Sequence, residues 1–302
     1  MEYTSSSVRD FYDLMKPRVM SLVIFTSFVG LVLSPINIHP FIALIAIICI
    51  AIGAGASGVL NMWYDSDIDG LMKRTINRPI PAGNINKSEA FTYGMVISAG
   101  SVVIMGILIN WSASFLLAFT IFFYAVIYTM WLKRRTMQNI VIGGAAGAFP
   151  PVIGWLSTGA PITIEPIILF LIIFLWTPPH FWALAIVTSG DYEKASIPMM
   201  PNVVGHNYTK RQIVYYSVVM SISVIVPYYI GMVSILYLIP AIILSLIFII
   251  ISLQLLKSSD NQKQKKYSKK LFLYSILYLF LIYILFLIDY GYRFYFGGLI
   301  FS

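Results

Sequence analysis

The sequence predicts an all-α, polytopic membrane protein with nine transmembrane helices. Of its 302 residues, 59% are hydrophobic and only 11% are charged, whereas a soluble domain carries about 25% charged residues. Nine apolar runs are long enough, or nearly so, to form helices of the about 20 residues that cross a hydrocarbon core. We therefore expect one integral-membrane domain over residues 1–302 and no separate soluble domain.

The nine spans follow one another with short polar connections. They are expected near 18–35, 40–60, 91–109, 113–131, 139–157, 166–187, 212–231, 237–256 and 271–289. The first run is expected to remain as a span, because the residues before it mix acids with bases and resemble no cleavable signal. The only cysteine, Cys49, lies in the second run, which excludes an internal disulfide and a cysteine-rich zinc site.

The connections between these runs alternate in charge. One alternate set of connections, with the N-terminal segment, holds 19 of the 20 Lys and Arg residues. The positive-inside rule then predicts a cytoplasmic N-terminus and a C-terminus on the opposite side. The net charge of +8 is thus explained by orientation in a lipid bilayer, and we expect no nucleic acid partner.

A polar motif ends the second run. Asn61, Asp65 and Asp69 are spaced by four residues, which places them on one face of a helix. Carboxylates this close repel unless a divalent cation lies between them, and Mg²⁺ prefers carboxylates together with phosphate oxygens. Asp67 points about 200° away from Asp65 and is expected to face solvent. The alternative is a solvated loop in which these acids form ordinary ion pairs.

Basic residues follow the acids. Lys73, Arg74 and Arg78 come one or two turns later, where they can bind phosphate or can simply set membrane orientation. Lys133 and Arg134 follow the fourth run and are equally compatible with a second phosphate clamp or a topology signal.

The sixth run contains Trp176, Pro178, Pro179 and His180. Two prolines remove helix hydrogen-bond donors, so we expect a break in this helix, as at Pro150-Pro151 in the fifth run. Two such breaks suggest a wide pocket for a flat, bulky ligand. His180 is either a packing residue or a functional intramembrane group.

A second acidic pair, Asp191 and Glu193, follows the sixth run on the same predicted side as Asp65. Asp191 could be no more than a helix N-cap. Read with the first motif, however, the two acidic clusters predict diphosphate chemistry, bridged by a metal ion, at the cytoplasmic face of the membrane.

These motifs resemble the UbiA superfamily of membrane prenyltransferases. The resemblance covers essentially the whole chain and implies the fold of that family, a bundle of nine helices. Its strings are Asn61-x3-Asp65-x3-Asp69, Lys73-Arg74-Thr75-x2-Arg78-Pro79, Leu132-Lys133-Arg134-Arg135-Thr136-x2-Asn139-Ile140, Trp176 to Ala185, and Asp191-Tyr192-x2-Ala195-x2-Pro198-Met199-x-Pro201. The last four look like the branch that transfers a farnesyl group to a vinyl group of haem B, with water addition, giving haem O and diphosphate.

The resemblance also implies roles for single residues. The implied catalytic residues are Asn61, Asp65, Asp69, Lys73 and Asp191. The implied diphosphate-binding residues are Arg74, Arg78, Lys133 and Arg134; His180 and Trp176 would bind haem; and Asp65, Asp69 and Asp191 would bind Mg²⁺. Many family members repeat the acids of the second motif, but Ala195 and Pro198 stand at those positions here, so the number of Mg²⁺ ions stays open.

The expected partners are farnesyl diphosphate, haem, the bilayer, and a haem A synthase or terminal oxidase assembly. The expected location is a prokaryotic plasma membrane, with the active site facing the cytoplasm. Two alternatives remain at this point: a UbiA-type prenyltransferase acting on an aromatic quinone precursor, and a transporter coupled to a cation. The transporter would place its acids near the membrane midplane, whereas these acids lie at the predicted membrane boundary.

Overall fold

The computed structural model describes residues 6–300, the last five of them by their backbone only, and shows helices joined by short connections with no strand in that range. Among the described residues, eight helices are long and apolar enough to cross a membrane, or nine if α1 (Val8–Leu14) and α2 (Pro17–Leu33), bent by 57°, form one span. The expected all-α polytopic architecture is confirmed.

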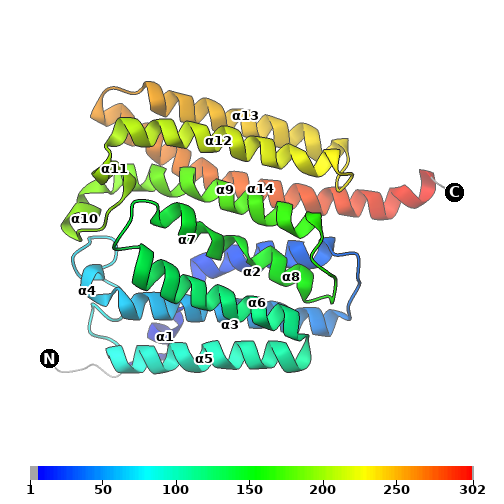
Figure 1. Cartoon of the computed structure of the whole chain (residues 1–302), viewed down its shortest axis with the longest axis horizontal. Helices are drawn as coiled ribbons and strands as arrows, with labels where there is room; N and C mark the ends of the chain where they lie inside the picture. The colour runs from blue at the N-terminus through cyan, green and yellow to red at the C-terminus, as the bar shows by residue number, and fades with distance from the viewer. Residues whose placement is uncertain (1–5, 301–302) are drawn as a thin grey trace. The chain divides into compact units, whose positions relative to one another are not determined.

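The described chain forms two compact units (Figure 1). Of the described residues, the first unit contains 6–161 and 190–199. Its helices are α1, α2, α3 (Pro40–Tyr64), α4 (Ser66–Asp69), α5 (Lys87–Leu108), α6 (Trp111–Phe122), η1 (Phe123–Leu132), α7 (Asn139–Ala148), α8 (Pro150–Leu156) and α10 (Ser189–Lys194). The expectation of a single domain over 1–302 stays a prediction.

Helices α2 and α8 pack closely because a glycine of each helix lies against the backbone of the other. A Cβ added at Gly30 of α2 would lie 2.0 Å from the carbonyl oxygen of Pro151, and one at Gly154 of α8 would lie 2.0 Å from that of Ser27. No side chain fits at such distances. The contact therefore depends on glycine in both helices.

The span that begins with α6 changes its winding halfway. From Phe123 the helix continues as the π-helical η1, and the amide of Lys133 donates to the carbonyl of Tyr128, five residues earlier, at 2.9 Å. Wide turns of this kind are rare in proteins, and many of those that occur lie at functional sites. Here the wide turn ends at the two basic residues singled out in the sequence.

The predicted break at Pro150-Pro151 is confirmed, since α7 ends at Ala148 and α8 begins at Pro150. Proline is well tolerated in the first turn of a helix, where its missing N–H has no partner to lose.

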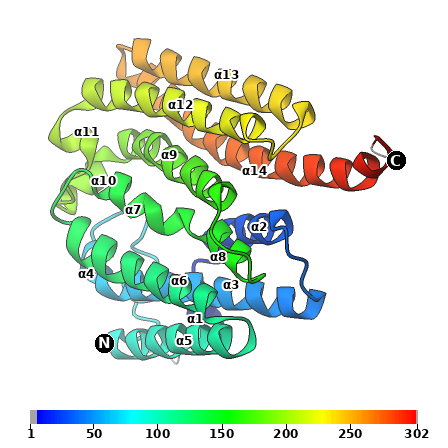
Figure 2. The same ribbon diagram turned by 45° about the vertical axis from the view of Figure 1, so that its right-hand side comes forward.

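Of the described residues, the second unit contains 162–189 and 200–300. Its helices are α9 (Ile164–Val187), α11 (Met200–Val203), α12 (His206–Tyr229), α13 (Ile235–Lys257) and α14 (Asn261–Ile300). α9 packs against α12 and α14, and α13 packs against the same two helices (Figure 2).

The predicted break in the sixth span is wrong, because α9 runs without interruption through Pro178 and Pro179. Proline fixes φ near the helical value, so two consecutive prolines remove hydrogen bonds without forcing a turn. Trp176, just before the prolines, donates from Nε1 to the carbonyl of Ser275 on α14 at 2.8 Å. The inference of a wide pocket between two broken helices loses one of its two supports.

Candidate active site

The polar motif lies where α3 ends. Asn61 is in the last turn, Asp65 is the C-cap, and Asp69 is the last residue of the short helix α4. One continuous helix was expected, but α3 stops at Tyr64. The four-residue spacing survives because the amide of Asp65 donates to Asn61 at 2.9 Å and that of Asp69 donates to Asp65 at 2.8 Å. Asn61, Asp65 and Asp69 are all buried.

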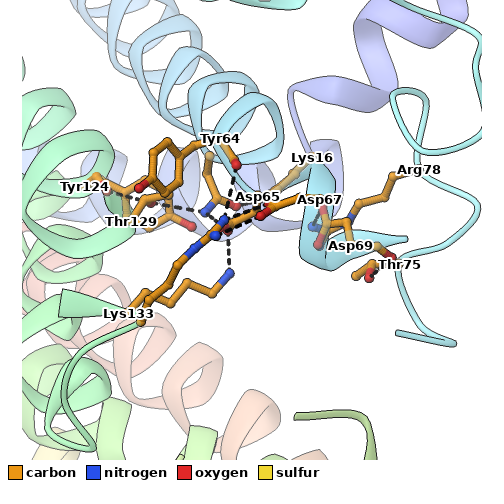
Figure 3. Close-up of polar contacts among 12 residues, drawn as sticks. Lys16, Tyr64, Asp65, Asp67, Asp69, Thr75, Arg78, Tyr124, Thr129 and Lys133 are labelled. Carbon is orange, nitrogen blue, oxygen red and sulfur yellow. Dashed lines mark hydrogen bonds and ion pairs between the residues drawn. The ribbon is translucent and has the colours of Figure 1, made fainter. Parts of the chain in front are cut away.

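Asp65 is held by Asn61 of its own helix and by the segment at the end of η1 (Figure 3). Its Oδ2 accepts from Nζ of Lys133 at the end of η1 and, at 2.8 Å, from Nδ2 of Asn61. Its Oδ1 lies 3.5 Å from Nη2 of Arg134 without forming a hydrogen bond. A buried carboxylate is costly unless paired, and Lys133 provides the pairing charge.

Asp69 is held by the loop that follows α4. Its Oδ2 accepts from Nη1 of Arg78 at 2.6 Å, and its carbonyl accepts from Oγ1 of Thr75 at 2.8 Å (Figure 3). Its Oδ1 has no hydrogen-bond partner among the described residues.

The two carboxylates suit a hard divalent cation. Asp65 and Asp69 each keep one buried oxygen without a hydrogen bond within the described part of the chain, and carboxylate oxygens are the protein ligands that Mg²⁺ takes beside phosphate. No group of three or more His, Cys, Asp or Glu side chains converges on one point in that part of the chain. In this state, each acid is neutralised by a cationic side chain.

Arg134 turns toward Asp67. Two of its nitrogens donate to the two Asp67 oxygens at 2.8 Å each, and its guanidinium lies 4.8 Å from the ring centroid of Tyr64. These hydrogen bonds hold the pKa of Asp67 below its ordinary value. Arg134, expected on diphosphate, therefore joins η1 to α4 in this structure, and Asp67 is exposed as expected.

The remaining predicted residues of this site are less enclosed. Lys73 and Arg74 are exposed in the loop after α4, and Asp191 is half-buried in α10. In both views α10 lies at the same end of the first unit as α4 (Figures 1 and 2). The segment that carries Asp191 is tied to α7 by Nδ2 of Asn139, 3.4 Å from the carbonyl of Pro198.

Sequence reasoning missed two residues of this cluster. Nζ of Lys16, between α1 and α2, donates to Oδ1 of Asn61. Oγ1 of Thr129 in η1 accepts from Nδ2 of Asn61 at 3.1 Å and donates to the carbonyl of Tyr124 at 2.8 Å. Both residues reach Asn61 from distant segments, which only a three-dimensional structure reveals.

A cavity of about 110 Å³ begins beside this cluster. Its wall includes Lys16 and, on α3, residues from Ser57 back to Ile50. Ser57 lies one turn before Asn61, so the cavity follows α3 from the polar cluster for about 10 Å into the span. Its other walls come from α2, α6, η1, α7 and α8 and are mostly apolar.

The predicted haem-binding residues lie in the second unit. The ring of His180 stacks on that of Trp176, with centroids 4.3 Å apart, and on that of Phe272, 4.7 Å apart. Oγ of Ser275 donates to the carbonyl of Phe272 at 2.6 Å and contacts Nδ1 of His180 at 2.6 Å. If the Ser275 hydroxyl gives its one proton to the carbonyl of Phe272, Nδ1 of His180 is the donor in the second contact and Nε2 keeps its lone pair.

The structure combines helices long enough to cross a membrane with paired acids and cations at the end of one helix, beside an apolar cavity. These features together are those of a class of membrane protein. The chain belongs to the UbiA prenyltransferase family, whose model matches residues 23–298. It is an integral membrane protein.

Curated relatives narrow the class. The chain is 56% identical over 286 residues to a protein named protoheme IX farnesyltransferase 2 from Mesorhizobium japonicum, covering 95% of this chain and 91% of the relative. It is 55% identical over 298 residues to the protoheme IX farnesyltransferase of Rhizobium meliloti, covering 98% and 94%.

Solved structures share the fold. A digeranylgeranylglyceryl phosphate synthase superposes with a TM-score of 0.77 at 20% identity, covering 94% of this chain and 98% of that one. A UbiA homologue from Archaeoglobus fulgidus, bound to DMAPP and Mg²⁺, superposes with a TM-score of 0.66 at 18% identity, covering 92% and 99%.

Proposed function

We propose that this chain transfers the farnesyl group of farnesyl diphosphate to a vinyl group of protohaem IX, giving haem O and diphosphate. The observation that carries the proposal is the identity of 55–56%, over at least 95% of the chain, to proteins named for this activity. An aromatic quinone precursor as acceptor is the alternative within the family, and nothing in the described residues favours it.

The carboxylates would hold the metal of the substrate complex. We assign Mg²⁺ to Asp65 and Asp69, whose free oxygens suit it, with Asp191 as a further ligand. When bound, Mg²⁺ supplies positive charge to the diphosphate. Support comes from the Archaeoglobus homologue, which binds Mg²⁺ with a prenyl diphosphate.

The cations would change partners as substrate binds. Lys133 and Arg78 now neutralise Asp65 and Asp69. Once the carboxylates bind a metal ion, these side chains can turn to the phosphate oxygens, with which Arg pairs bidentately. Lys73 and Arg74, exposed in the loop nearby, would add positive charge around the leaving group. Arg134 would join them only after releasing Asp67.

The bond changes follow from the substrates. The C1–O bond of farnesyl diphosphate breaks with its electron pair going to diphosphate, and the vinyl group of haem attacks the allylic carbon. The cation formed beside the porphyrin takes hydroxide from water, whose second proton goes to solvent. Stabilisation of the leaving charge by fixed cations needs no covalent enzyme intermediate.

Asp65→Asn tests the role of the first motif. We expect this variant to lose at least about 100-fold in kcat while it remains folded in detergent, because the amide keeps the shape of the carboxylate. The measurement is the mass of the pigment formed from haem and farnesyl diphosphate. Turnover close to that of the unmodified chain at ordinary Mg²⁺ would contradict the assignment. Absence of farnesylated haem from the unmodified chain would refute the proposed function itself.

His180 is proposed to position haem, with Nε2 as an iron ligand. His180→Ala should shift the Soret band of the chain with bound haem and weaken haem binding, whereas His39→Ala, which changes a histidine at the start of α3, should do neither. An unchanged Soret band and unchanged affinity in His180→Ala would remove the ligand assignment.

The site is proposed to face the cytoplasm of a prokaryotic plasma membrane, on the distribution of basic residues. A haem A synthase or a terminal oxidase assembly is proposed to receive the product.

A further inference from the structure

Lys16 adopts a backbone conformation that costs stability. It connects α1 to α2 with φ 56° and ψ 61°, in the left-handed region. Lys16 and Ser196 are the two non-glycine residues with positive φ in the described part of the chain. Glycine adopts this conformation readily and a residue with a Cβ does not. Backbone stability therefore does not explain why lysine stands at this position. Non-glycine residues with positive φ concentrate at functional sites.

Glycines on α3 allow the connection between α1 and α2 to pack closely against that helix. A Cβ added at Gly55 would lie 2.4 Å from Cε of Met15, and one at Gly58 would lie 3.2 Å from the carbonyl oxygen of Met15. The backbone just before Lys16 can therefore seat directly on α3, one turn before Asn61. Because the backbone is fixed here, the side chain of Lys16 is positioned next to the carboxylate cluster.

The ammonium group of Lys16 differs from the other cations of the cluster. Lys133 and Arg78 each form a direct ion pair with a carboxylate. Nζ of Lys16 instead donates to Oδ1 of Asn61, a neutral amide, and within the described residues no carboxylate lies at ion-pair distance from it. The Lys16 side chain is half-buried and forms no ion pair by direct contact with the described residues.

Lys16 also lies at a boundary. On one side is the amide of Asn61, which donates to Asp65. On the other is the apolar cavity, whose wall Lys16 shares with Val19, Val23 and Ile50. If Asp65 binds the diphosphate through a metal ion and the cavity receives the prenyl chain, the bond between them falls at this boundary.

We propose that Lys16 is a catalytic residue whose ammonium contacts the ester oxygen of the prenyl diphosphate and stabilises the negative charge that develops there as the C1–O bond breaks. The electron pair of that bond goes to the diphosphate oxygen, and Lys16 keeps its proton while donating a hydrogen bond. This inference rests on the proposed function, because it needs a prenyl diphosphate with its head at Asp65.

Two variants separate catalysis from structure. Lys16→Gly removes the ammonium and relieves the left-handed backbone, so it should be as resistant to thermal unfolding as the unmodified chain. Lys16→Met removes the charge and keeps the length. Each should lower kcat about 100-fold to 1,000-fold, the range for removing one charge-stabilising donor, with less than about tenfold change in KM for farnesyl diphosphate. The matched control is Lys87→Met, which removes an exposed lysine of the same unit and should leave kcat and KM unchanged.

A third variant restores the charge. Lys16→Cys, in a chain whose Cys49 is replaced by Ala, should regain most of the lost kcat when 2-bromoethylamine converts Cys at position 16 into an aminoethyl side chain. Bromoethane, which adds the same carbons without the amine, should not restore it.

Three results would overturn the assignment. One is a kcat within about threefold of the unmodified chain for Lys16→Met. Another is a loss of more than about 100-fold in affinity for the uncleaved thiolo analogue of farnesyl diphosphate, which would make Lys16 a ground-state binding residue. The third is equal rescue by both reagents. All three presuppose an active unmodified chain; if that chain makes no farnesylated haem, the proposed function fails instead.

Discussion

The amide of Asn61 has one orientation only. Lys16 can only donate a hydrogen bond and the Asp65 carboxylate can only accept one, so Oδ1 must face the lysine and Nδ2 the carboxylate. Thr129 takes the second amide proton. Asn61 therefore connects three segments of the chain, those that carry Lys16, Asp65 and Thr129. We expect a change in any of them to alter the position of Asp65.

The pair of Asp67 and Arg134 makes a prediction about pH. The hydrogen bonds from Arg134 lower the pKa of Asp67 from its ordinary value of 3.8, so the pair stabilises the folded chain above that pH. This contribution is lost as the pH falls through the lowered pKa of the folded chain. Asp67→Asn should cost less than about 1 kcal/mol, because Asp67 is exposed and Arg134 is only partly buried.

The measurement is the apparent Tm of both chains in detergent as a function of pH. The difference between them should be constant from about pH 5 to 8 and should shrink below about pH 4. A difference that grows toward acid pH would contradict the assigned pairing. Ser66→Ala, beside the pair, is the control and should show no such dependence.

The contact between α2 and α8 is the element most sensitive to substitution. Gly30→Ala places a Cβ 2.0 Å from a backbone oxygen, and a backbone cannot move aside as a side chain can. We expect a loss of about 3 kcal/mol or more, at the upper end of overpacking, and a fall in apparent Tm of roughly 6 °C or more.

Gly100→Ala provides the matched control for Gly30→Ala. Gly100 also lies inside a helix, but a Cβ there would meet nothing within 4 Å. Alanine is the better helix former by up to about 1 kcal/mol, so the control should be unchanged or slightly more stable. Equal effects of the two substitutions would show that the close approach of α2 and α8 does not limit stability.

The spans were predictable from the sequence but their internal geometry was not. Hydropathy located every long helix, for instance Ile164–Val187 against an expected 166–187, because lipid requires about 20 apolar residues in succession. It could not reveal the π-helical half of Phe123–Leu132 or the continuity of α9 through two prolines. Both features depend on contacts with neighbouring helices, which form only in the folded chain.

The site shows the same division. Spacing alone grouped Asn61, Asp65 and Asp69, since near neighbours on a helix stay near in the fold. Lys16 and Thr129 join them from 45 and 68 residues away, and no pattern in the sequence measures such a distance. The pairing of Arg134 with Asp67 was likewise not indicated by the sequence, and the expected contact of Arg134 with diphosphate stays a prediction.

For the whole molecule, the bent pair α1 and α2 decides the topology. If the pair forms one span, the chain crosses nine times and its termini lie on opposite sides; without it, eight crossings put them on the same side. We expect nine, on the distribution of the basic residues. Green fluorescent protein, which does not fluoresce after export in an unfolded state, should be bright when fused to the N-terminus and dark when fused to the C-terminus. Bright fusions at both ends would contradict nine crossings.

The return of residues 190–199 to the first unit has a consequence for biosynthesis. A ribosome adds roughly 5–20 residues per second, so the last piece of that unit emerges seconds after Pro161, once all of α9 has been made. Until then Asn139 has no Pro198 to bind. An insertion or a translational pause within α9 should therefore leave the first half of the nascent chain unfinished and prone to degradation by membrane proteases.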